Sequence, residues 1–266
     1  MIVSRTLRKI ARYEFSNVAR SRWLVPYTLG LALLAEMLIR FSGTATAALL
    51  GAGNLMLLVI PLVSLVVGTM YFYSSRSFIE LMLAQPVRRR ELAIGLLIGS
   101  ATPLAAGFLA GVGIPLAVHG AFGAETRGAA IALLGSGALL STAFAALAFF
   151  ISVRIEDRLR GLATAIGLWL VLALAYDGVI LVVTAVFSDY PLEKPLLGAM
   201  LLNPVDLARV WLMLQLDVAA LLGYTGAVLR RFFGSGAGVT LAATALIAWT
   251  AVPMLLGVRR FERKDF

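Results

Sequence analysis

Six long apolar runs divide the chain, and polar segments separate them. The runs are Leu24–Phe41, Leu55–Tyr73, Leu92–Val118, Ala129–Val153, Leu162–Phe187 and Val239–Val258. A helix rises about 1.5 Å per residue, so even the shortest run covers about 27 Å of hydrocarbon. The pattern predicts an all-α polytopic membrane protein with six transmembrane helices, whose membrane domain covers residues 24–258. The third and fifth runs are longer than one crossing needs, so we expect them to tilt, kink or protrude.

Both ends of the chain are short and basic. Residues 1–23 carry apolar positions at largely helical spacing among basic ones, which predicts an interfacial helix lying on the cytoplasmic leaflet. Residues 259–266 form a cytoplasmic tail.

Two connections are more than plain loops. Residues 74–91 hold a short amphipathic segment, Phe78–Leu83, followed by Pro86 and three arginines. Residues 188–238 form a long extracytoplasmic segment in which Asn203 suits an N-cap, Pro204 the first helical position and Asp206 the first turn. We expect a helix from there to about Leu222, re-entrant or lying on the surface rather than a seventh span.

The basic residues sort to one side of the membrane. The N-terminal segment, residues 74–91, the loop before the fifth run and the C-terminal tail carry 17 of the 23 Lys and Arg residues. Basic loops stay cytoplasmic during insertion. The charge pattern therefore places both termini in the cytoplasm, and we expect the protein to lie in a bacterial inner membrane.

Composition excludes several classes of function. A chain that is 61% hydrophobic and 14% charged does not make a soluble globular domain. The net charge of +9 comes from basic residues that flank apolar spans. This placement indicates contact with lipid headgroups rather than with nucleic acid. With no cysteine and one histidine, His119, no metal site or cofactor is expected.

The chain carries no nucleotide-hydrolysis motif. A phosphate-binding loop needs a lysine directly after a glycine, and none of the three lysines follows one. We therefore expect no catalytic residues here, and ATP and Mg to be bound by a partner ATPase if transport uses them.

Two acids lie inside apolar runs, where charge costs about 2.5–3.5 kcal/mol at a helix centre. Glu36 lies four residues before Arg40 and can pair with it along one helix face. Asp177 has no such neighbour in its own run. Asp177 could line a polar pathway, bond across a dimer interface or be protonated.

These features together resemble the type-2 ABC exporter permeases. The segment F-I-E-L-M-L-A-Q-P-V-R-R-R-E-L, residues 78–92, is similar to the family's coupling segment. The stretch L-L-N-P-V-D-L-A-R, residues 201–209, and the Y-D-G of the fifth run resemble the NosY-like branch, the permease of the NosDFY system for nitrous oxide reductase maturation. An acidic run common at the coupling segment is reduced here to Glu80.

The resemblance implies a homodimer bound to two ATPase subunits, with a NosD-like periplasmic partner that supports copper-site assembly. It assigns ATPase coupling to Arg76, Ser77, Phe78, Glu80, Leu81 and Gln85. It places Asn203, Pro204, Asp206 and Arg209 near the periplasmic partner. The output would be export of a sulfur species or mechanical coupling to that partner.

Other functions fit the same pattern. A generic type-2 exporter of drug, ion, lipid or polysaccharide shares the topology. An ion-coupled secondary transporter could use Asp177 and Glu36 as proton sites, although no inverted repeat is visible. A membrane scaffold needs no transport cycle at all.

Overall fold

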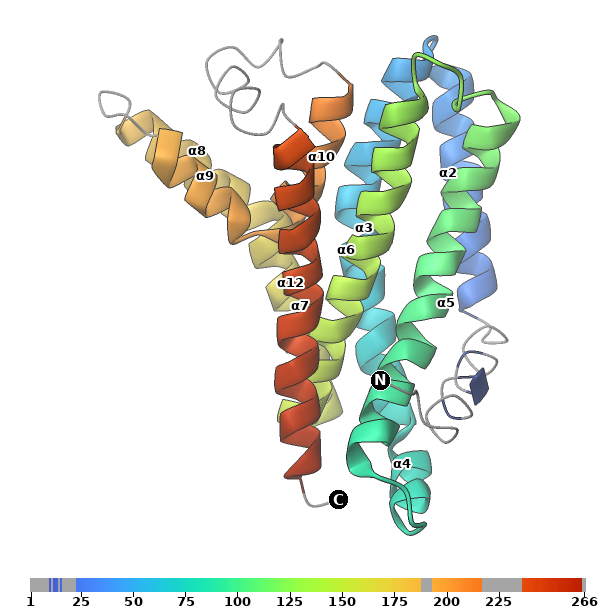
Figure 1. The fold of residues 1–266 in the computed structure, drawn as a ribbon, viewed down its shortest axis with the longest axis vertical. Helices are drawn as coiled ribbons and strands as arrows, with labels where there is room; N and C mark the ends of the chain where they lie inside the picture. Colours follow the sequence, from blue (N-terminus) through green and yellow to red (C-terminus); the bar gives the residue numbers. More distant parts are fainter. Residues whose placement is uncertain are drawn as a thin grey trace.

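A computed structural model describes residues 10, 12, 13, 15, 23–187, 193–216 and 236–264 of the chain. Every regular element in this part of the chain is a helix (Figure 1). The elements are α2 (Leu24–Phe41), α3 (Ala45–Ser74), α4 (Arg76–Leu83), α5 (Arg89–Val118), α6 (Arg127–Arg154), α7 (Arg158–Leu170), the π-helical turn η1 (Val171–Ala175), α8 (Tyr176–Val186), α9 (Glu193–Leu201), α10 (Pro204–Gln215) and α12 (Gly236–Glu262).

Six helices in the described residues are long and apolar enough to cross a membrane, which confirms the predicted architecture. The first span has the predicted bounds, and α7, η1 and α8 together make the fifth. The second starts ten residues before the predicted Leu55, because the Thr44 hydroxyl accepts a hydrogen bond from the Ala47 amide at 3.2 Å and caps α3 at its N-terminus. The residues between carry mainly small side chains, which weaken the apolar signal.

Helix α6 is the centre of the bundle and contacts α3, α5, α7, α10 and α12. Without a hydrophobic force between helices in lipid, small residues and buried hydroxyls hold such helices together. The buried hydroxyls of Ser64 and Ser141 lie 3.2 Å apart between α3 and α6. Gly107 and Gly111 of α5 lie directly against Thr28 of α2, and their small-xxx-small spacing permits this close approach.

The fifth span lies at the edge of the bundle and contains the expected irregularity. Its middle is the π-helical turn η1, and beyond that turn α8 leans away from the other spans (Figure 1). No residue of α8 is buried within this chain.

Helices α9 and α10 form a V whose tip, at Leu202 and Asn203, lies against the middle of the fifth span. The Tyr176 hydroxyl donates to the Ala199 carbonyl at 2.7 Å, and the Trp249 indole donates to the Leu201 carbonyl at 3.1 Å. This V is a re-entrant hairpin, one of the two arrangements expected. The expected end of its second helix at Leu222 is wrong, because α10 ends at Gln215.

Helix α4, the turn of residues 155–157 and the tail after α12 lie at one end of the bundle, here named the basic end. Residues 42–44 and 119–126 form turns at the opposite end. Most of the interfacial helix predicted for residues 1–23 lies outside the described residues. Within it, Ile10, Arg12, Tyr13 and Phe15 are helical, and Ile10 is buried in the cluster that also contains Ile79 and Phe72.

Candidate functional site

The short helix α4 presents two different faces at the basic end. Ser77, Glu80, Leu81 and Gln85 are exposed, with Leu81 exposed to 63%. Glu80 and Leu81 lie three and four residues after Ser77, which places the three on one side of α4, and Gln85 lies in the turn after the helix. Four of the six predicted coupling residues are thus exposed at the basic end.

The other two predicted coupling residues turn inward. The Phe78 ring stacks on Tyr13 of the N-terminal segment, with ring centroids 5.7 Å apart. The Arg76 guanidinium donates to the Glu156 carbonyl at 3.5 Å, in the turn after α6. These contacts give Arg76 and Phe78 a bracing role within the chain, behind the exposed face of α4.

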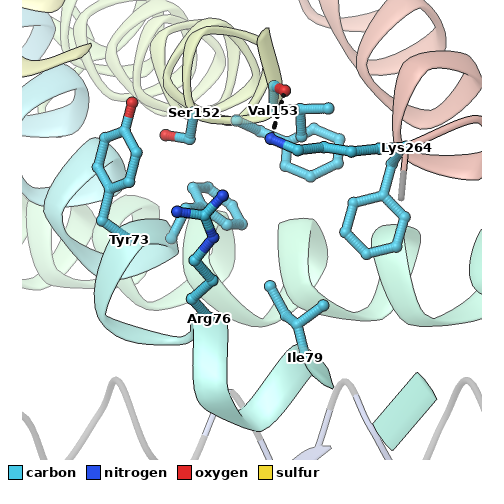
Figure 2. Close-up of a pocket in the computed structure, with 9 residues that line it drawn as sticks. Tyr73, Arg76, Ile79, Ser152, Val153 and Lys264 are labelled. Carbon is cyan, nitrogen blue, oxygen red and sulfur yellow. Dashed lines mark hydrogen bonds between the residues drawn. The ribbon is translucent and has the colours of Figure 1, made fainter. Parts of the chain in front are cut away.

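The end of α6 gathers donors from three other elements. Its final carbonyls have no partner within the helix, and cationic or hydroxyl groups stabilise such an end. The Lys264 ammonium donates to the Val153 carbonyl at 3.1 Å, and the Tyr73 hydroxyl donates to the Ile155 carbonyl at 2.8 Å. Figure 2 shows Tyr73, Arg76 and Lys264 converging there around a small cavity of about 30 Å³.

A second polar site lies at the tip of the re-entrant hairpin. Asn203 is fully buried, and its side-chain oxygen accepts from the Val205 amide at 3.0 Å, which confirms the predicted N-cap of α10. Its side-chain nitrogen donates to the Leu172 carbonyl at 2.9 Å and to the Asp206 carboxylate at 3.2 Å. One amide therefore caps α10 and joins it to η1 of the fifth span.

Asp177 pairs with an arginine that comes from another helix. Arg209 of α10 lies 2.8 Å from one Asp177 carboxylate oxygen and donates to the other at 3.0 Å. The same guanidinium donates to Asp206 at 3.0 Å. Two carboxylates, those of Asp177 and Asp206, thus share one cation. The Asp177 carboxylate is therefore paired with a cation. The sequence does not reveal this pair, because its two residues lie on different helices.

A hollow of about 440 Å³ opens beside this charged cluster, between α8, α9 and α10. Apolar side chains line most of it, including Ile180, Leu196 and Met213, and Asp177, Asp206 and Arg209 lie along it. Its size and mixed lining are in the range of small-molecule pockets.

Glu36 belongs to neither site. Its carboxylate lies 2.7 Å from the Arg40 guanidinium, as predicted, and 3.5 Å from the His119 imidazole of α5's end. The residues Asn203, Pro204 and Asp206 are buried within this chain, so their direct contact with a periplasmic partner stays a prediction.

The chain matches the family described as ABC-2 family transporter protein over residues 41–266. It belongs to the ABC-2 transporter family. A probable ABC transporter permease protein NosY of Pseudomonas aeruginosa is 26% identical to it, over 96% of this chain and 97% of that protein. A protein of the same description from Stutzerimonas stutzeri is 27% identical, with the same shares of the two chains covered.

As a NosY-like ABC-2 permease, the chain is a non-catalytic membrane subunit of an ABC transporter. Such a permease works in a lipid membrane with ATPase partners. This favours an ABC permease subunit over an ion-coupled secondary transporter or a membrane scaffold. Sequence reasoning misses the contacts of Tyr73 and Lys264 at the basic end. In the sequence Lys264 is one of several basic residues of the tail, and no local pattern marks Tyr73.

Proposed function

We propose that this permease forms a homodimer driven by two ATPase subunits and supports copper-site assembly of nitrous oxide reductase. The basic end would face the cytoplasm with both termini, where the ATPases work. The alignment with two NosY proteins over almost the whole of each chain supports the NosY-like assignment. The exposed face of α4 with Ser77, Glu80 and Leu81, and the exposed Gln85 in the turn after it, support the docking place.

The output of the cycle is export of a sulfur species or mechanical coupling to a NosD-like periplasmic partner. Both outputs need α4 to follow the ATPases and the fifth span to move with the re-entrant hairpin. Arg76 supports the first requirement through its contact with Glu156. Asn203 and Arg209 support the second through their contacts with Leu172 and Asp177.

Deletion of the gene from its native host, followed by purification of nitrous oxide reductase, tests the assignment. The reductase should lack copper at the site that needs maturation, and the plasmid-borne chain should restore it. A Glu80→Lys chain should restore it poorly, whereas Glu125→Lys, an exposed acid in the turn at the opposite end, should restore it fully. A copper-replete reductase in the deletion strain would contradict the maturation role and leave a generic type-2 exporter.

A further inference from the structure

The C-terminal tail is fixed to the rest of the basic end by Lys264. Its ammonium donates to the Val153 carbonyl at 3.1 Å and lies 3.5 Å from the Glu156 carboxylate. The Lys264 side chain is only 11% exposed, whereas Arg259, Arg260 and Arg263 of the same helix end are exposed. Lys264 therefore differs from the tail arginines, whose exposure suits contact with solvent and headgroups.

Two further contacts hold the tail in register. Arg89, in the first turn of α5, donates to the Lys264 carbonyl at 2.6 Å and to the Glu262 carbonyl at 3.3 Å. Phe261 is 1% exposed, and its ring lies 6.2 Å from that of Phe149 in α6. The end of α12 is thus joined to the start of α5 and the end of α6.

The turn after α6 is the meeting point of α4, the fifth span and the sixth. Arg76 of α4 reaches the Glu156 carbonyl, and Lys264 reaches Val153 one turn earlier. The same turn continues into α7. The Asp157 carboxylate caps this helix by accepting a hydrogen bond from the Arg160 amide at 2.7 Å. The Lys264 ammonium also interacts favourably with the negative end of the α6 dipole.

We propose that Lys264 is a positioning residue that ties the sixth span to the turn after α6, so that a movement of α4 reaches the fifth and sixth spans together. This inference rests on the proposed ATPase coupling. The covalent link through residues 155–157 carries the movement into α7. The sixth span has no covalent link to that turn, and Lys264 supplies a non-covalent one.

The test uses the whole complex of this chain with its ATPase subunits in lipid nanodiscs. The chain has no cysteine, so one introduced cysteine takes an environment-sensitive fluorophore at a single place in it. Leu241→Cys reports on α12, and Val186→Cys reports on α8, since both side chains are exposed at the ends of these helices away from the basic end. The fluorescence change on adding ATP with vanadate is measured at each position, alongside ATPase co-purification.

Lys264→Met should keep ATPase co-purification and reduce the ATP-dependent change at position 241, because the sixth span loses its hydrogen bond to the Val153 carbonyl. The change at position 186 should stay. Lys264→Arg should restore the signal at 241, because a guanidinium can donate to the same carbonyl. Arg263→Met, which removes an equal charge from the exposed neighbour, should change neither signal.

A full signal at position 241 in Lys264→Met would overturn the inference, and so would equal loss at 241 and 186. If the ATPase is bound but the unsubstituted complex shows no ATP-dependent change at position 241, the inference is overturned as well. Failure of the ATPase to co-purify with the unsubstituted chain is a different result, because it would overturn the proposed function itself.

Discussion

The side-chain nitrogen of Asn203 lies 2.9 Å from the carbonyl oxygen of Leu172, and this hydrogen bond joins the tip of the re-entrant hairpin to the π-helical turn of the fifth span. A π-helical turn changes the hydrogen-bond register of a helix, and such turns occur frequently at functional sites. Backbone groups released inside a membrane protein need another partner in the protein. Asn203 donates to one carbonyl of this turn and so joins the hairpin to the fifth span.

Asn203→Ala should destabilise the permease by about 2–4 kcal/mol, because it removes the cap of α10 and leaves the Leu172 carbonyl without this donor. Thermal unfolding of the purified chain in mild detergent measures the loss. Asn203→Ser keeps a capping oxygen without the reach to Leu172, so it should fall between Ala and the unsubstituted chain. Equal stability of the Ala and Ser variants would show that the capping oxygen contributes nothing, and a Ser variant as stable as the unsubstituted chain would show that the bond to Leu172 contributes nothing.

Replacing Arg209 should harm the protein more than replacing Asp177. Arg209→Met leaves the carboxylates of Asp177 and Asp206 close together without their shared cation, and removing one partner of a buried pair is strongly destabilising. Because the Asp177 side chain is 41% exposed, we expect Arg209→Met to cost less than breaking a fully buried pair, about 1–3 kcal/mol.

A double-mutant cycle separates pairing from other effects. Asp177→Asn in the Arg209→Met background should cost less than in the unsubstituted chain, or improve stability, because it removes an unpaired charge. Additive costs would mean that the two side chains do not interact.

For reductase maturation, Asp177→Asn should reduce activity more than Glu36→Gln, because Glu36 lies outside the hairpin site. Wild-type activity in both variants would remove a functional role for Asp177.

Gly161 permits the close approach of Tyr73 to the turn after α6. A Cβ at position 161 would collide with the Tyr73 ring and hydroxyl. Gly161→Ala should therefore disturb the bond from Tyr73 to the Ile155 carbonyl and cost about 1–3 kcal/mol in thermal unfolding. Gly167→Ala is the matched control, since it lies in the same helix and a Cβ there meets no atom within 4 Å.

The control variant should be neutral or stabilised, because alanine favours a helix by about 1 kcal/mol over glycine. A loss at position 167 as large as at 161 would show that α7 tolerates no Cβ for reasons unrelated to Tyr73.

Local patterns in the sequence predict the spans, the α10 cap and the Glu36–Arg40 pair, because the residues involved are neighbours along the chain. The sites themselves depend on residues far apart. Asp177 and Arg209 are separated by 32 positions, Tyr73 and Ile155 by 82, and Val153 and Lys264 by 111. Only the packing of helices brings them together, and no spacing rule for a single helix reports it.

The errors at the start of α3 and at the end of α10 have the same kind of cause. The start of α3 is rich in alanine and glycine, so apolar pattern alone placed it too late, although Thr44 marks it with a cap. The apolar pattern continues past Gln215, so it placed the end of α10 too late. Hydropathy measures burial in lipid or protein and does not by itself mark where a helix begins or ends.

Affinity purification of the tagged chain from its native host, in mild detergent or nanodiscs and followed by mass spectrometry, tests the central claim most directly. A P-loop ATPase should co-purify in a one-to-one ratio with the chain, and Leu81→Glu or Glu80→Lys on the exposed face of α4 should reduce its recovery about tenfold or more, whereas Glu125→Lys should not. A periplasmic companion in the same eluate would support the NosY-like role. A stable oligomer that carries no ATPase even in lipid nanodiscs would contradict the account.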